Sequence, residues 1–173
     1  MQVVLGGTFD PVHDGHRKLF TRAFELGDLT VGLTSDDLAP KTRNVERYVR
    51  PWAARREDLA EELERLAAEY DREFEIRELN DPFGIATEPK FDVLIVSPET
   101  TGGGEKVNEI RAERGYEPLE LEVVDHVYAE DGEKISSTRI VNGEIDEQGN
   151  LTPERPGREA EHGEASEWTS GGE

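Results

Sequence analysis

Two histidines near the start of the chain are the residues whose type and spacing point most directly to chemistry. His13 and His16 lie three residues apart in the stretch GGTFDPVHDGH, residues 6–16, between a short apolar run and a segment with helical spacing. Glycines let a backbone approach a ligand closely, and the free N–H groups at a helix start favour an anion. Imidazole N–H groups can donate to the same anion. The stretch therefore predicts a phosphate-binding junction between a strand and a helix.

A second candidate anion site lies in the last patterned part of the chain. Residues 135–140 read ISSTRI, so the hydroxyls of Ser136, Ser137 and Thr138 precede Arg139 where a strand gives way to a helix. Hydroxyl and guanidinium groups bind phosphate oxygens well. Ser and Thr also cap helices without binding any ligand. Because both motifs follow a strand, and ligands bind at that edge of open α/β sheets, we favour the ligand.

A basic segment stands out in an otherwise acidic chain. Six basic residues fall within sixteen positions and are opposed only by Glu46: Lys41, Arg43, Arg47, Arg50, Arg55 and Arg56. One interpretation is a basic wall for an anionic substrate, on a loop able to close over it. Lys41 is the best single candidate because it lies in the loop. The alternative is that some of the arginines pair with the acids of the helix expected at 57–69.

A glycine-rich segment follows the most apolar run of the chain. Residues 97–104 read SPETTGGG, and three glycines before a helix suit close approach to a nucleotide. Glu99 and Asn108 are candidates to contact a ribose or a base.

The elements that must position these residues follow from the apolar spacing. Strands are expected at residues 3–5, 29–33, 74–76, 92–96 and 119–127, and helices at 14–26, from 51, from about 105 to 114, and from 135. Pro51 begins the second helix, and Gly27 closes the first. Strands that alternate with helices predict an α/β fold, an open five-stranded parallel sheet with helices on both faces. Residues 1–151 form one expected domain, and the acidic segment 152–173, broken by Pro and Gly, is expected to be a disordered tail.

Composition excludes several classes of function. The 173 residues include no cysteine, which rules out disulfides, thiolate catalysis and cysteine-ligated metals. With only four histidines, a dedicated metal site is not expected, and any metal should arrive with a nucleotide as Mg²⁺. No run is long enough to span a membrane and no signal peptide precedes residue 3, so we expect a soluble cytoplasmic protein with no membrane partner.

The charge of the chain is strongly negative. The net charge of −20, from 40 acidic and 20 basic residues, argues against nucleic acid as a partner. We interpret the charge as adaptation to the high intracellular salt of a halophile, in which self-repulsion is screened.

The two anion-site motifs resemble the signatures of a known family. GTFDPVHDGH is similar to the T-x-x-x-x-H-x-G-H signature of the nucleotidyltransferase superfamily, and ISSTR at 135–139 is similar to its second signature. Three further segments resemble the archaeal type of phosphopantetheine adenylyltransferase: AEDGEK at 129–134, VSPET at 96–100 and GEID at 143–146. The resemblance runs from about residue 2 to about residue 149.

The resemblance implies a Rossmann-like nucleotidyltransferase fold and a reaction. The family makes 3′-dephospho-CoA and pyrophosphate from ATP and 4′-phosphopantetheine with Mg²⁺, by direct in-line attack and with no covalent enzyme intermediate. His16 would hold the α-phosphate, with His13 beside it on the triphosphate, and Lys41 would be a loop lysine against the phosphates. The other implied ATP contacts are Gly7, Thr8, Phe9 (through its backbone), Gly15, Ser136, Ser137, Thr138 and Arg139.

The acceptor phosphate is where the chain departs from its relatives. Bacterial members carry an arginine pair after the central strand, where this chain has Ser97-Pro98-Glu99, and eukaryotic relatives have an arginine where Thr101-Gly102 stands. Thr8 and Lys41 are expected to contact the acceptor, and we hypothesise that Arg47 and Arg50 replace the missing arginines.

Two other functions stay open on the residues alone. A related adenylyl- or cytidylyltransferase would use FMN, nicotinamide mononucleotide or a phosphoalcohol as acceptor with the same phosphate machinery. A non-catalytic nucleotide-binding regulator would keep the fold without the reaction. For the oligomeric state, a monomer is slightly favoured.

Overall fold

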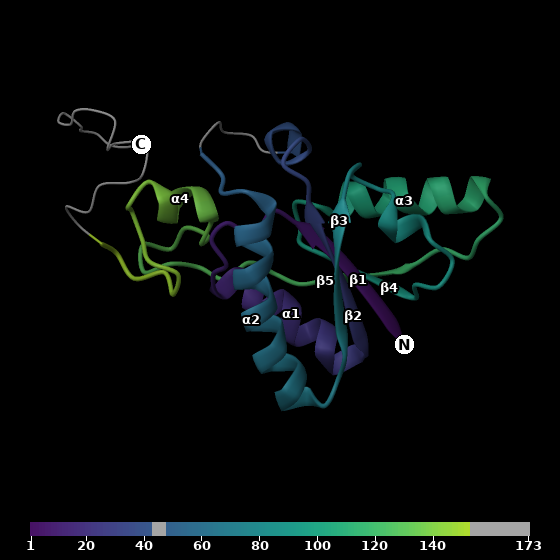
Figure 1. Cartoon of the computed structure of the whole chain (residues 1–173), viewed down its shortest axis with the longest axis horizontal. Helices are drawn as coiled ribbons and strands as arrows, with labels where there is room; N and C mark the ends of the chain where they lie inside the picture. The colour runs from purple at the N-terminus through teal and green to yellow at the C-terminus, as the bar shows by residue number, and fades with distance from the viewer. Residues whose placement is uncertain (43–47, 153–173) are drawn as a thin grey trace.

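A five-stranded, all-parallel sheet forms the centre of the protein (Figure 1). The computed structural model describes residues 1–42 and 48–152, except for the side chains of residues 41 and 42. The strands are β1 (Gln2–Gly7), β2 (Asp28–Thr34), β3 (Phe74–Leu79), β4 (Val93–Val96) and β5 (Glu120–Val123), in the sheet order β3-β2-β1-β4-β5. The predicted α/β class and the parallel sheet are confirmed.

Helices cover both faces of the sheet. They are α1 (Asp14–Leu26), α2 (Trp52–Tyr70), α3 (Thr101–Glu113) and the short α4 (Ser137–Val141), with 3₁₀ turns η1 (Ala39–Thr42) and η2 (Ile85–Thr87). Figure 1 shows α3 on the other side of the strands from α1 and α2. Each of these helices in the described part of the chain is too short or too polar to cross a lipid bilayer.

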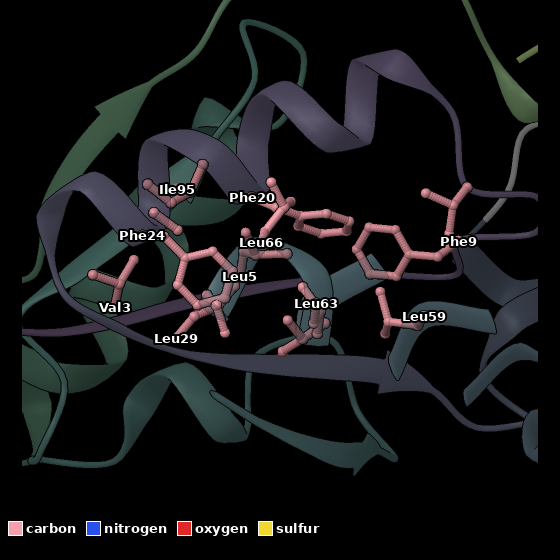
Figure 2. Packing of buried hydrophobic residues seen from close by; sticks show 14 of the residues in the cluster. Val3, Leu5, Phe9, Phe20, Phe24, Leu29, Leu59, Leu63, Leu66 and Ile95 are labelled. Carbon is pink, nitrogen blue, oxygen red and sulfur yellow. The ribbon is translucent and has the colours of Figure 1, made fainter. Parts of the chain in front are cut away.

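Alternation along the strands divides the core into two layers. Successive strand residues point to opposite faces, so Val3 and Leu5 of β1 pack with Phe20 and Phe24 of α1 (Figure 2). Val4 instead belongs to the layer beneath α3 and η2. Because each layer has its own helices, the sheet is packed on both of its faces.

Several predicted boundaries were wrong. The helix α3 begins at Thr101, so Gly102, Gly103 and Gly104 form its first turn instead of a loop before it. A Cβ on Gly104 would lie 2.9 Å from Leu121 Cδ2, which explains glycine in the helix: it lets α3 lie close against β5. The fifth strand is shorter than expected, and the last helix has only five residues. The expected tail from 153 onward lies outside the described residues.

The order of the strands decides where a ligand can bind. From β1 the chain continues toward β2 and β3 on one side, whereas β4 and β5 lie on the other. In open α/β sheets the crevice for ligands forms at such a switch point, outside the carboxyl ends of the strands. Here that point lies between Gly7, the last residue of β1, and Val96, the last residue of β4.

Candidate active site

Two cavities meet at this switch point. The polar cavity, of about 290 Å³, is lined by the start of α1 and by residues of the segment 124–137. The apolar cavity, of about 380 Å³, lies beneath α3 and η2. Both are lined by Leu5, Gly6 and Gly7 of β1 and by Ile95 and Thr100. A ligand in each cavity would therefore approach the other over the backbone of Gly6 and Gly7.

His13 and His16 cap the helix α1 with their own side chains. His13 Nδ1 accepts from the backbone N–H of Gly15 at 3.0 Å, and His16 Nδ1 accepts from the backbone N–H of His13 at 3.2 Å. The histidines thus form a capping box, with imidazoles in place of the usual hydroxyl and carboxylate. Because both Nδ1 atoms accept, each neutral ring carries its proton on Nε2. Each ring therefore has an N–H left to donate beside the polar cavity that both residues line.

The two imidazoles are held in the neutral form. Their rings stack with centroids 3.7 Å apart and planes 20° apart. Burial, with help from the nearby Arg17 guanidinium, lowers the pKa of His13 to about 4. Burial, the His13 ring and Arg17 together hold the pKa of His16 well below its usual range. At neutral pH the pair therefore consists of two uncharged N–H donors.

Two glycines of the motif are required by the rings that lie on them. A Cβ on Gly7 would lie 2.8 Å from the ring of Phe9, and a Cβ on Gly15 would lie 2.8 Å from Cε1 of His13. The Phe9 ring is buried, packs edge-on to His16 at 4.7 Å between centroids and lies beside Phe20 in the core (Figure 2). Phe9 itself has a φ of 52°. Its side chain thus fixes His16, which leaves its backbone as the part that can face a ligand.

The second motif forms the opposite wall of the polar cavity. Ser136 and Ser137 line it, as do Lys134 and Glu99. Ser136 Oγ also accepts from the backbone N–H of Arg139 at 3.2 Å, so the capping alternative is confirmed for this residue. Ser137 Oγ donates to the Pro11 carbonyl at 2.8 Å, which ties α4 to the first motif. The sheet edge therefore brings the two sequence motifs to one cavity, as predicted.

Arg139 is held away from the cavity lining by acids. Its guanidinium pairs with Asp131 and, at 2.9 Å, with Glu144, and its Nη1 donates to the Lys134 carbonyl at 3.0 Å. These carboxylates raise its pKa. Neither Arg139 nor Thr138 lines the cavity. Their predicted contacts with ATP stay predictions.

The basic segment is only partly described. Arg43 and Arg47 lie outside the described residues, and so does the side chain of Lys41, whose backbone forms part of η1. Arg50 binds Asp10 at 2.6 Å and Asp58 of α2 at 2.8 Å, as the pairing alternative expects. It lines neither cavity. Its predicted contact with the acceptor phosphate stays a prediction and would require these two ion pairs to change.

Several residues that line the site were not among the site residues predicted from the sequence. Lys134 forms an ion pair with Glu99 across the polar cavity, and Asp125 and His126 line the same wall. Lys134 stands directly before the ISSTR motif, and that position could have identified it. Thr34 ends β2 and lines the apolar cavity with Thr8. Asn108, a candidate for ribose or base, instead bonds the backbone of Leu119 through both polar atoms of its amide.

Metal ligands are sparse in the described chain. Residues 1–42 and 48–152 contain no group of three or more His, Asp or Glu side chains arranged to hold a metal ion. Glu99 and Asp125 are the carboxylates that line the polar cavity. This donor set fits a Mg²⁺ ion that is held mainly by phosphates and water.

Known proteins resemble the chain over most of its length. Residues 4–143 match the family described as cytidylyltransferase-like. A protein of Methanosarcina barkeri named phosphopantetheine adenylyltransferase is 46% identical over 87% of this chain and 92% of its own. One of the same name from Archaeoglobus fulgidus is 43% identical over 87% and 99%. A crystal structure of an A. fulgidus protein described as having unknown function superposes with a TM-score of 0.63 at 38% identity, over 72% of this chain and 90% of that one.

Proposed function

This chain belongs to the cytidylyltransferase-like family, and from that premise we propose that it transfers the adenylyl group of ATP to 4′-phosphopantetheine, forming 3′-dephospho-CoA and pyrophosphate. It is a nucleotidyltransferase. Its relatives named phosphopantetheine adenylyltransferase, an enzyme of coenzyme A biosynthesis, align with it over nearly their whole length. The observation that carries the proposal is the meeting of a polar and an apolar cavity at Gly6 and Gly7. Group transfer requires the reacting ends of two ligands at one place.

The polar cavity suits the nucleotide. A triphosphate needs several hydrogen-bond donors and positive charge, and the cavity supplies two imidazole Nε2–H groups, the Ser136 hydroxyl and the Lys134 ammonium. The start of α1 adds the positive end of a helix dipole. We therefore place ATP in this cavity.

The apolar cavity suits the pantetheine arm. Its walls include Leu79, Phe83, Ile85, Ala86 and Val107, and Thr8 and the buried Thr34 border it on the β1–β2 side. The arm of 4′-phosphopantetheine is uncharged, with a phosphate at one end only. We place the arm beneath α3 and its phosphate at Thr8. The cationic ring of nicotinamide mononucleotide would meet no carboxylate among the residues that line this cavity.

In the reaction, an oxygen of the acceptor phosphate attacks the α-phosphorus of ATP. A new P–O bond forms, the bond to the β-phosphate oxygen breaks, and pyrophosphate leaves with the electron pair. Because each imidazole carries its proton on Nε2, both histidines act as donors, and we propose that the transfer is direct. Catalysis comes from position and from donors aimed at the charge that grows on the phosphate oxygens. His16 Nε2–H, beside His13, is the donor for the α-phosphate.

Magnesium would accompany the triphosphate, neutralise part of its charge and be held by few protein ligands, with Glu99 and Asp125 as candidates. Lys41 remains a candidate for the phosphates by resemblance, and Arg47 and Arg50 remain our hypothesis for the acceptor phosphate. A cytoplasmic location, a monomeric state and adaptation to high salt also remain predictions. For the last, the melting temperature should rise from dilute buffer to molar KCl as the charge of −20 is screened.

The test of function is pyrophosphate release in molar KCl with Mg-ATP. 4′-Phosphopantetheine, FMN and nicotinamide mononucleotide are offered separately, with His16→Ala beside the natural protein. We expect turnover with phosphopantetheine alone and its loss in the variant. Turnover with another acceptor would keep the mechanism and overturn the substrate. ATP binding with no turnover on any acceptor would support the non-catalytic regulator.

A further inference from the structure

A fully buried arginine lies behind the point where the two cavities meet. The guanidinium of Arg55, on the first turn of α2, is 0% exposed. Its Nε donates to the Arg50 carbonyl at 2.7 Å, and its Nη2 donates to the Thr34 carbonyl at 2.9 Å and to Asp36 at 3.1 Å. Its Nη1 donates to the Thr8 carbonyl at 3.2 Å and to Thr34 Oγ1 at 3.4 Å. Arg55 thus joins the carboxyl ends of β1 and β2.

The hydroxyls of Thr8 and Thr34 continue this network. Their Oγ1 atoms lie 2.8 Å apart, and either atom can be the donor in that bond. Thr34 is 3% exposed, so its hydroxyl proton needs an acceptor within the protein. In the described part of the chain, Thr8 Oγ1 is the acceptor within reach. If Thr8 donated instead, Thr34 Oγ1 would accept from both Arg55 and Thr8, and its own proton would be buried without a partner.

We propose that Arg55, Thr34 and Thr8 form a directed hydrogen-bond relay that presents the Thr8 hydroxyl as a donor to the acceptor phosphate. Arg55 donates to Thr34, Thr34 donates to Thr8, and the Thr8 proton is left for the cavity that Thr8 lines. Each donated bond polarises the next hydroxyl, so a positive charge at the start of the chain strengthens the donor at its end. Arg55 and Thr34 are positioning residues, since neither needs to touch the reacting atoms.

The relay would also substitute for the arginines that relatives place near the acceptor phosphate and that this chain lacks. A buried guanidinium acting through two hydroxyls supplies positive character at Thr8 without a charged side chain in the apolar cavity. This inference rests on the proposed function for the identity of the acceptor. The direction of the relay does not depend on it.

The kinetic test removes one hydroxyl at a time. Thr34→Val keeps the shape of the side chain and breaks the relay, and we expect kcat to fall about tenfold while the KM for ATP stays within about twofold. Thr34→Ser keeps the hydroxyl and should restore most of kcat. In a Thr8→Val background, Thr34→Val should change kcat no further, because the relay has already lost its end.

A matched variant separates the relay from loss of stability. Thr87, on η2, is likewise buried, and its hydroxyl bonds the Gly84 carbonyl and Arg114, but it lines neither cavity. Thr87→Val should lower the melting temperature about as much as Thr34→Val and leave kcat unchanged. An equal loss of kcat in both variants, or additive effects of Thr8→Val and Thr34→Val, would overturn the relay.

Nuclear magnetic resonance reads the direction of the relay without any acceptor. A hydroxyl proton buried between Thr34 and Thr8 exchanges slowly with water, and we expect it to couple to the side-chain carbons of Thr34. Coupling to those of Thr8 would show the opposite direction and overturn the proposal. If the natural protein turns over a different acceptor, the proposed substrate fails and the kinetic test runs with that acceptor. If it turns over none, the resonance decides alone.

Discussion

The two cavities at the strand ends are lined by different kinds of side chain, although they share the backbone of Gly6 and Gly7. The polar cavity is walled by histidines, serines and an ion pair, and the apolar cavity by side chains of α3, η2 and the sheet. For the proposed reaction, this difference would divide the work between the cavities. Donors in fixed positions act on charge that moves during the reaction, whereas apolar walls act on a part of the substrate that does not react.

The largest fall in kcat is expected when the polar cavity loses its central hydrogen-bond donor. His16→Ala removes the Nε2–H beside the α-phosphate, and we expect kcat to fall about 100- to 1,000-fold, as for other lost donors to a developing oxyanion. The KM for phosphopantetheine should change little. Steady-state kinetics with both substrates would check this, and His16→Gln, whose side-chain amide can also donate, should retain more activity than the alanine variant. A fall in kcat below tenfold would contradict the role given to His16.

Filling the apolar cavity should affect the acceptor alone. Gly103 lines that cavity, and a Cβ there would meet nothing within 4 Å, so Gly103→Leu can begin a side chain there without a backbone clash. We expect the KM for phosphopantetheine to rise about tenfold and the KM for ATP to stay constant. Gly102, the neighbouring residue, is as open but lines neither cavity, and Gly102→Leu is the control. Equal effects of the two substitutions would mean that the arm does not lie beneath α3.

Removal of a charge from the polar cavity should change the KM for ATP instead of the KM for phosphopantetheine, and by a smaller factor. Lys134→Met removes an ammonium that faces Glu99 across the cavity, and we expect the KM for ATP to rise about fivefold, because a half-exposed charge is screened by water. The acceptor KM should not change. Lys106→Met, at an exposed pair with Glu109 on α3, is the control. A rise in the acceptor KM would place Lys134 on the other ligand.

The lowered pKa of His13 should give the smallest effect, a change of stability with pH. The pKa of His13, lowered to about 4 by burial, should leave its imidazole neutral from pH 7 to about 5.5, whereas in denaturant it should titrate near its ordinary value of about 6.5. The unfolded chain then binds more protons than the folded one between about pH 4 and 6.5, so stability should fall as the pH drops through that window. Histidine proton resonances measured against pH would check this. A midpoint near 6.5 in the folded protein would contradict the stacked, neutral pair.

A nucleotide should partly reverse that shift. The negative phosphates of a non-hydrolysable ATP analogue favour a charged imidazole, so binding should raise the pKa of His13 and take up protons at about pH 5. Calorimetry in buffers with different ionisation enthalpies measures that uptake. An acceptor analogue in the apolar cavity should cause less proton uptake, because His13 and His16 line the polar cavity and not the apolar one.

Local patterns were enough to predict most of the fold. Helix α1 was predicted from Asp14 to Leu26 because its apolar spacing and the closing glycine are both short-range signals. The parallel sheet followed from alternation of strands and helices, and the union of His13 with Ser136 and Ser137 followed from the rule that strand ends share an edge. The glycines of α3 misled the prediction, since packing against Leu121 outweighs the low helix propensity of glycine there.

Tertiary structure alone decided how those residues can act. The sequence by itself determined the strand–helix order, the two motifs and the wealth of acids around them, because each depends on neighbours along the chain. It did not determine that Arg139 and Arg50 are bound by carboxylates, that the imidazoles stack and stay neutral, or that Arg55 is buried behind Thr34. Those facts depend on partners from other elements, and the pKa or hydrogen bond of a side chain is set by whatever the fold brings within a few ångströms of it.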